Sequence, residues 1–213
     1  MPKDTWWNLP EAKRQRIIDA ALVEFGARGF SAGSLNTIAR DADIAKGSLF
    51  QYFEDKLDMF ASISSFCSEA IRSGVLDVVG SEPEEGFFTF VRRLVGTWLQ
   101  YFRDHPAYQA MAFAVANEID AEARAATRRV ANEVWVATLG PMVKRAADRA
   151  EFQDGVDPDQ VIAMVVLLLR HLDSAPFLPH IDPVLGLHGA PPARVEEIAL
   201  DLVDALERAY GRP

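Results

Sequence analysis

Polar side chains suited to contacting nucleic acid are concentrated in the first quarter of the chain. Lys46, Ser48 and Gln51 fall on a short segment in which Leu49 and Phe53 repeat at the spacing of a helix. A lysine can neutralise a phosphate, and a glutamine amide can pair with an adenine edge in the major groove of DNA. The spacing therefore predicts a helix over residues 45–52 with one apolar face and one face that reads DNA.

A second short helix, over residues 34–41, is predicted just before it. Ser34 can cap this helix, and Ile38 and Ala39 give it a buried face. Ala42 and Asp43 make a tight connection to the next helix. Two short helices joined by a turn of a few residues predict a helix-turn-helix, whose second helix enters the major groove.

The predicted contacts are of two kinds, those with DNA bases and those with phosphates. Gln51 and Asn36 can each pair with an adenine, Phe50 can touch a thymine methyl, and Gly47 lets the backbone approach closely. Contacts with phosphates, which fix the register without reading sequence, are expected from Ser34, Thr37, Tyr52 and Lys56. In isolation these polar residues would be ordinary solvated side chains, and Tyr52 the edge of a core. The predicted set comprises Ser34, Asn36, Thr37, Lys46, Gly47, Ser48, Phe50, Gln51, Tyr52 and Lys56.

The segment from Arg16 to Leu57 resembles the N-terminal domain of tetracycline-repressor (TetR) family regulators. Three departures from the family pattern are Gly33 in place of a threonine, Asp43 in place of the turn glycine, and Phe50 in place of a tyrosine. The resemblance implies a homodimeric regulator that binds operator DNA and responds to a small effector. It rests on Ile17-Ile-Asp-Ala-Ala, Phe25-Gly-Ala-Arg-Gly-Phe30, Ile38-Ala39, Ala42-Asp-Ile, Lys46-Gly-Ser-Leu-Phe, Tyr52-Phe53 and Lys56-Leu57.

The rest of the chain also has the pattern of helices. Apolar residues recur at three- and four-residue spacing almost throughout, and alternation typical of strands is never sustained. We expect an all-α fold with a DNA-binding domain over 1–55 and an effector-binding and dimerisation domain over 56–213. The nine expected helices cover residues 10–28, 34–41, 45–52, 56–79, 84–104, 107–117, 120–151, 158–174 and 191–210.

Charge is unevenly divided between these two parts. Residues 1–57 carry eight basic and eight acidic side chains, so the whole net charge of -9 belongs to the remainder. A neutral segment can still present a basic face, while an acidic remainder limits non-specific adhesion to DNA. The single cysteine, Cys67, excludes an internal disulfide framework, and no signal peptide or membrane span is recognisable. We expect a cytoplasmic protein.

Aromatic and soft apolar residues concentrated in the middle helices suggest a cavity for a hydrophobic or aromatic effector. The alternative is that they are packing residues, and that Arg170 and His171 form a polar pair satisfied by a carboxylate such as Asp173. The candidate ligand contacts are Phe66, Trp98, Tyr101, Phe102, Met111, Phe113, Asn117, Trp135, Met142, Arg170 and His171.

The last two predicted helices offer a dimer interface. The helix over 158–174 is apolar on nearly every face, so it must be covered all round. Pairing of both helices with their symmetry mates would provide that cover, and the alternative is that they complete the core of a monomer. The candidate interface residues are Val161, Val165, Leu168, Leu172, Val195, Ile198, Leu202 and Leu206.

An enzyme is the main rival class, but the sequence contains no nucleophile elbow, phosphate loop or pair of metal ligands. We therefore expect no catalytic residue, no metal and no cofactor. A second rival is a helical module that binds a ligand or a protein and whose DNA-reading helix is degenerate. The sequence favours a transcription regulator, and we expect a repressor that is released from a palindromic operator by its effector.

Overall fold

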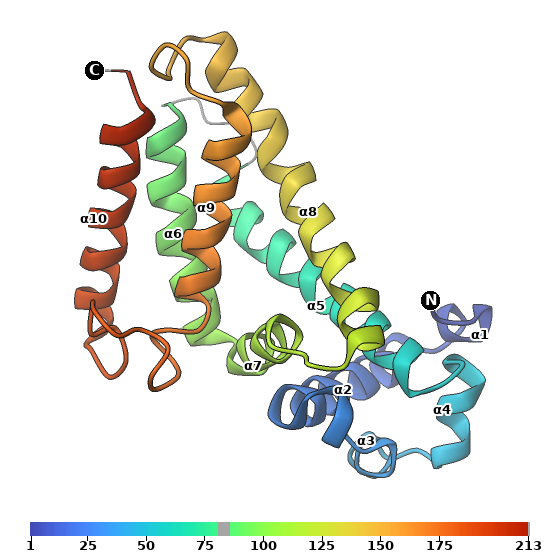
Figure 1. Ribbon diagram of the computed structural model, residues 1–213. Coiled ribbons are helices and arrows are strands. Elements are labelled where there is room, and N and C mark those ends of the chain that lie inside the picture. Colours follow the sequence, from blue (N-terminus) through green and yellow to red (C-terminus); the bar gives the residue numbers. More distant parts are fainter. Residues whose placement is uncertain (81–85, 213) are drawn as a thin grey trace. The chain divides into compact units, whose positions relative to one another are not determined.

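The computed structural model describes residues 1–80 and 86–212, the side chains of 129–132 excepted, and these residues form an all-α fold. The only pairing of strand type in the described ranges is an isolated bridge between Phe152 and Gly211. The helices are α1 (Asp4–Trp7), α2 (Glu11–Ala32), α3 (Leu35–Asp41), α4 (Lys46–Tyr52), α5 (Lys56–Val79), α6 (Phe87–Asp104), α7 (Pro106–Ala116), α8 (Ala121–Asp148), α9 (Pro158–Leu172) and α10 (Pro192–Tyr210) (Figure 1).

The nine expected helices are present, and α1 is an addition that the sequence pattern did not predict. Helix α2 also continues past its expected end, because the chain kinks at Gly29 and resumes helical conformation as far as Ala32. Gly29 has φ +65°, a conformation that L side chains rarely adopt. Among the described helices, none has the length and apolar character needed to cross a bilayer.

The described chain forms two compact units. The first contains residues 1–71 and 105–132, and the second contains residues 72–104 and 133–213. These units group residues by contact, so α7 and the start of α8 belong with the predicted DNA-binding helices, while α5 and α8 each contribute to both units. The functional boundary at residue 55 stays a prediction.

In the first unit, α2 is the central helix. Its buried stripe of Ile17, Ala21, Leu22 and Phe25 supports the core, as its spacing predicted. Helix α7 packs on another side of α2, where Gly26 permits close approach. The end of α2 is held by a carboxylate, since Glu118, which is buried, accepts a hydrogen bond from the backbone N–H of Phe30 at 3.0 Å.

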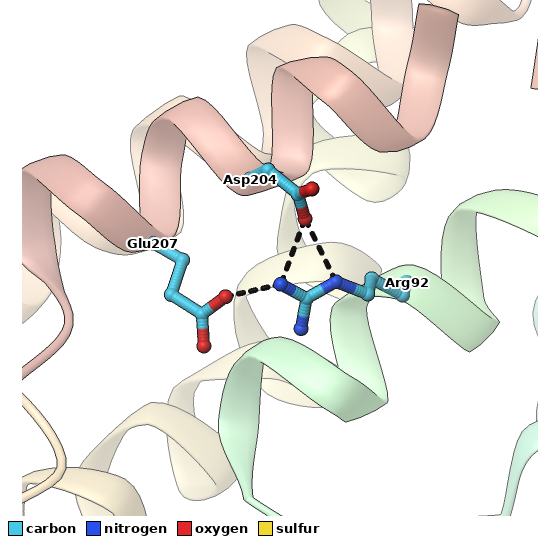
Figure 2. Close-up of polar contacts among 3 residues, drawn as sticks. All are labelled: Arg92, Asp204 and Glu207. Atoms are coloured by element: carbon cyan, nitrogen blue, oxygen red, sulfur yellow. Dashed lines mark hydrogen bonds and ion pairs between the residues drawn. The ribbon is translucent and has the colours of Figure 1, made fainter. Parts of the chain in front are cut away.

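In the second unit, α6, α9 and α10 lie side by side (Figure 1). The buried face of α6 is almost entirely aromatic or branched aliphatic. At the α6–α10 contact, the guanidinium of Arg92 donates to Asp204 through Nε (2.9 Å) and Nη2 (2.7 Å) and also reaches Glu207 (Figure 2). These groups are partly solvated, so the cluster fixes the register of the two helices more than it adds stability.

Replacing Gly26 tests the α2–α7 contact. An added Cβ would lie 3.0 Å from the Cβ of Ala110 and 3.1 Å from the backbone nitrogen of Met111. We expect Gly26→Ala to lower the free energy of unfolding by about 1–2 kcal/mol, because overpacking outweighs the better helix propensity of alanine. The measurement is urea denaturation.

Gly96 supplies the control, since its added Cβ would meet only the flexible Glu196 carboxylate at 3.5 Å. Gly96→Ala should therefore raise the free energy of unfolding by about 0.5–1 kcal/mol. Equal effects of the two substitutions would contradict a tight α2–α7 contact.

Candidate nucleic-acid interface

The connection between α3 and α4 has the geometry of a helix-turn-helix. Ser34 caps α3, its hydroxyl accepting from the N–H of Thr37 at 3.3 Å, as predicted. Asp43 has φ 53°, which confirms that it takes the role expected of a turn glycine. The N–H of Ile44 donates to the carbonyl of Ala39 at 2.9 Å and closes the turn. The two short helices are thus fixed to each other by the backbone itself.

Burial on α4 divides its residues as the spacing predicted, with one exception. Leu49 and Phe53 are buried, whereas Lys46, Gly47 and Gln51 are exposed. A Cβ added at Gly47 would meet nothing within 4 Å, so the backbone is open there. The other candidate contacts also reach the surface: Asn36 and Phe50 are exposed, and Ser34, Thr37, Ser48 and Lys56 are half-buried.

The exception is Tyr52, whose expected exposure is wrong. Its side chain is 5% exposed, and its ring meets the edge of Trp6 at a centroid distance of 6.1 Å. The ammonium of Lys13 lies 5.8 Å from the ring centroid. Tyr52 is therefore a core residue on the buried face of α4, which was the alternative interpretation. The sequence could not show this, because the tryptophan that covers it belongs to an unpredicted helix.

Lys56 has an additional structural contact. Its ammonium donates to the carbonyl of Ser31 at 3.1 Å and lies 4.9 Å from the ring centroid of Phe30. The start of α5 is thereby tied to the end of α2. The contact with a DNA phosphate stays a prediction.

The candidate ligand residues fall into both units. Phe66, Met111, Phe113 and Asn117 belong to the first unit, and the other seven belong to the second. In the first unit, Phe66 stacks on Trp6 at 5.8 Å and the Asn117 amide donates to the carbonyl of Phe113. The stacking of Phe66 is the packing role that the sequence left open as an alternative, and the hydrogen bond of Asn117 is a contact that was not expected.

In the second unit, the candidate aromatics form a packed cluster. Trp98 lies 4.8 Å from Phe102 and 4.9 Å from Trp135 between ring centroids. The ring of Tyr101 packs on Gly74, where an added Cβ would be only 2.5 Å away. The cluster gives α6 a rigid aromatic face. The contact of these rings with a ligand stays a prediction.

A groove of about 450 Å³ lies between α5 and α8 within the second unit. Of the candidate ligand residues only Met142 lines it. The lining includes two arginines and, among the described residues, no acidic side chain. Its α8 members lie three or four residues apart along one face of the helix, a spacing that is visible in the sequence. The lining residues are Arg72, Leu76, Val134, Ala137, Thr138, Pro141, Met142 and Arg145.

At the end of α9, the surroundings of Asp173 favour the alternative that Arg170 is satisfied by a carboxylate and does not bind a ligand. Burial raises the pKa of Asp173 to about 6, against the opposing effects of a hydrogen bond from Ser174 and the positive charge of Arg170. The carboxylate and the guanidinium therefore interact electrostatically, as a satisfied polar pair would.

In the described part of the chain, no group of histidine, cysteine and acidic side chains could hold a metal. Cys67 is buried, which raises its pKa to about 12.

The structure shows how much surface the candidate dimer residues offer to a partner. Val161, Val165, Leu172, Val195 and Ile198 are buried within their own chain and offer little, and their role in a dimer stays a prediction. Leu168, Leu202 and Leu206 are half-buried. The sequence could not choose a face because α9 is apolar nearly all round. The large apolar side chains that α9 leaves exposed are Met164 (37%) and Leu167 (60%).

Asp173 makes stability depend on pH. Its folded pKa lies above the unfolded value, so the native state binds the proton more tightly and stability falls as pH rises from about 4 to 6. Asp173→Asn removes this loss and keeps an acceptor for the Ser174 hydroxyl. We expect the variant to gain about 1–3 kcal/mol of unfolding free energy over the wild type between pH 4 and pH 7.5, by urea denaturation. A difference independent of pH would contradict a raised pKa.

Comparison with known proteins gives a consistent result for the N-terminal region. The family model described as bacterial regulatory proteins, tetR family, matches residues 17–63. The chain is 43% identical over 53 residues to the HTH-type transcriptional regulator SrpR of Pseudomonas putida and 42% identical over 50 residues to AcrR of Shigella flexneri. These matches cover 25% and 24% of this chain and span only 25% and 23% of the relatives' own lengths.

Solved structures extend the likeness of fold to the whole chain. A TetR family transcriptional regulator from Chloroflexus aurantiacus matches with a TM-score of 0.66 at 23% identity, covering 100% of both chains. The regulator FadR from Bacillus subtilis, in complex with stearoyl-CoA, matches with a TM-score of 0.71 at 14% identity, covering 89% of this chain and 96% of that one.

Proposed function

We propose, from the premise that the chain belongs to the tetR family of bacterial regulatory proteins, that it is a homodimeric repressor released from a palindromic operator by a small effector. The observation that carries the proposal is the capped α3–turn–α4 unit, which buries Leu49 and leaves Lys46 and Gln51 exposed. A protein acting on bacterial chromosomal DNA works in the cytoplasm.

Different exposed residues of α3 and α4 would contact the phosphates and the bases of the operator. Lys46 would neutralise a phosphate, while Gln51 and Asn36 would pair with adenine edges and Phe50 would contact a thymine methyl. The open backbone at Gly47 would allow α4 to lie deep in the major groove. The acidic character of the chain after residue 57 would limit adhesion to arbitrary sequences.

The exposed apolar side chains of α9 support a dimer with a second copy of this chain. Met164 and Leu167 lie on one face of the helix, three residues apart. A two-fold axis through this face would pair it with itself and supply two reading helices. Half-sites one helical turn apart, about 34–36 Å, would then read the same sequence in opposite directions.

The groove between α5 and α8 is the candidate effector site. Its apolar lining suits the hydrophobic effector that the sequence predicts, and its volume falls within the range of about 300–1,000 Å³ typical of small-molecule sites. The guanidiniums of Arg72 and Arg145 favour an effector that also carries an anionic group. The stearoyl-CoA complex of FadR shows that a protein of this fold can hold an anionic amphiphile.

Helix α5 offers a route from effector to DNA. It begins at Lys56, beside the predicted DNA contacts, and reaches the groove at Arg72 and Leu76 without a break. An effector that prefers one position of α5 would shift the population towards one spacing of the two reading helices. Because both half-sites must be met together, a small change of spacing would release the operator.

The proposal is tested by selecting duplexes from a random-sequence library with the intact chain at two salt concentrations. A regulator should enrich a palindrome and protect both half-sites in footprinting, with affinity falling steeply as salt rises. Enrichment of no sequence at either salt would contradict the DNA-binding role and favour the rival, a helical module with a degenerate DNA-reading helix.

Two substitutions separate base reading from phosphate binding. Gln51→Ala should cost about 1–3 kcal/mol at the selected site and relax the preference at one base position. Lys46→Met should weaken binding to all duplexes and reduce the salt slope by about one. Fluorescence anisotropy across a salt series measures both, and Lys144→Met, an exposed lysine on α8, is the control. Identical salt slopes for the wild type and Lys46→Met would contradict the phosphate role.

Dodecanoate is a suitable probe of the groove, and dodecan-1-ol is its uncharged match. We expect calorimetry to detect dodecanoate binding that weakens about tenfold in Arg72→Met and in Arg145→Met, because each loses a charge-assisted contact. Lys144→Met again serves as the control, and thermal melting checks the fold. Equal binding of the acid and the alcohol, or unchanged binding in both variants, would contradict an anion-accepting groove.

A further inference from the structure

The C-terminal turn of α4 is held by the first residues of the chain. A helix leaves its last four carbonyls without partners inside the helix. Here three successive carbonyls receive donors from the N-terminal segment: Phe50 O accepts from the Lys3 ammonium at 2.8 Å, Gln51 O from the Thr5 hydroxyl, and Tyr52 O from the Lys3 backbone N–H at 2.8 Å. The segment therefore caps the reading helix from outside it.

Trp6 anchors the same segment. Its side chain is 0% exposed, stacks on Phe66 with an interplanar angle of 8°, and lies 5.0 Å from Phe53 between ring centroids. Its buried indole N–H has no acceptor among the described residues. Packing rather than hydrogen bonding therefore holds Trp6, and burial of a ring this large fixes residues 3–7 beneath α4.

We propose that residues Lys3 to Trp7 form a brace that positions α4 for DNA reading, with Lys3 and Thr5 as positioning residues. The inference rests on the proposed function and goes beyond it, because these residues need not touch DNA. A helix of seven residues is marginal on its own, so its orientation depends on what holds its ends. If the brace is loosened, the competent orientation is less populated and the apparent affinity falls by that fraction.

The brace can be weakened without disturbing the core. Thr5→Val keeps the shape of the side chain and removes the donor to Gln51 O, and Lys3→Met keeps the stem and removes the donor to Phe50 O. Both side chains are exposed, so neither change opens a cavity. Thr97→Val on α6 and Lys144→Met on α8 are controls of the same chemistry outside the brace.

Hydrogen exchange and DNA binding together test the proposal. In the double variant we expect the backbone amides of Leu49 to Phe53 to exchange about tenfold faster, and the affinity for the selected palindrome to fall about tenfold, at an unchanged salt slope. The unchanged slope matters because Lys3 could instead bind a phosphate, in which case Lys3→Met would reduce the slope by about one and Thr5→Val would have no effect.

That second pattern would overturn the brace, as would wild-type exchange rates in α4 or control variants that lose as much affinity as the double variant. Failure of the proposed function is distinguishable, because it would appear as a wild-type chain that enriches no duplex. Exchange of α4 amides in the free protein reports on the brace whether or not DNA binds.

Discussion

The shortness of the two helices that would meet DNA is the constraint on which the first unit depends. Helices α3 and α4 have seven residues each, so neither gains enough hydrogen bonds to repay the cost of starting a helix. Contacts outside the hydrogen bonds of these two helices therefore have to stabilise their helical conformation. Burial of Ile38 and Leu49, the Ser34 cap and the closed turn at Asp43 supply part of this stabilisation.

Two buried carboxylates supply more of this stabilisation. Glu24 accepts from the backbone N–H of Ser34 at 2.9 Å, and Glu118 accepts from that of Phe30 at 3.0 Å. Hydrogen bonds to a charged acceptor are stronger than those between neutral groups, and they compensate for removing the carboxylates from water. Together they fix the path of the chain between the end of α2 and the start of α3. Glu118 comes from the α7–α8 connection, so a later part of the chain helps to place α3 and α4.

Local signals in the sequence were sufficient for the helix-turn-helix and insufficient for what surrounds it. Ser34, Asp43 and the spacing of Leu49 and Phe53 act through the backbone within a few residues, and each was interpreted correctly. The burial of Tyr52 depends on Trp6, which is distant in sequence and lies in a helix of four residues without periodicity.

The later helices were predicted, but which of their side chains face outward could not be, for a different reason. Helix α9 is apolar nearly all round, so only packing could reveal that Val161 and Val165 face inward while Met164 and Leu167 face outward. The aromatic residues were recognised as a group, but rings that fill a core and rings that line a cavity have the same composition. The groove was missed because none of the residues that line it is aromatic.

The continuity of α5 has a consequence for how such a chain can change over time. An α-helix turns about 100° with each residue, so inserting or deleting a single residue between Lys56 and Arg72 would rotate the groove-lining side chains about the helix axis by that angle. The helix contains no proline that could absorb the change. Residue types along α5 can therefore vary. The number of residues in α5 is constrained, because it sets the rotation of the groove-lining side chains about the helix axis. We expect relatives that share this arrangement to vary in the connections on either side of α5 and to keep the number of residues within it.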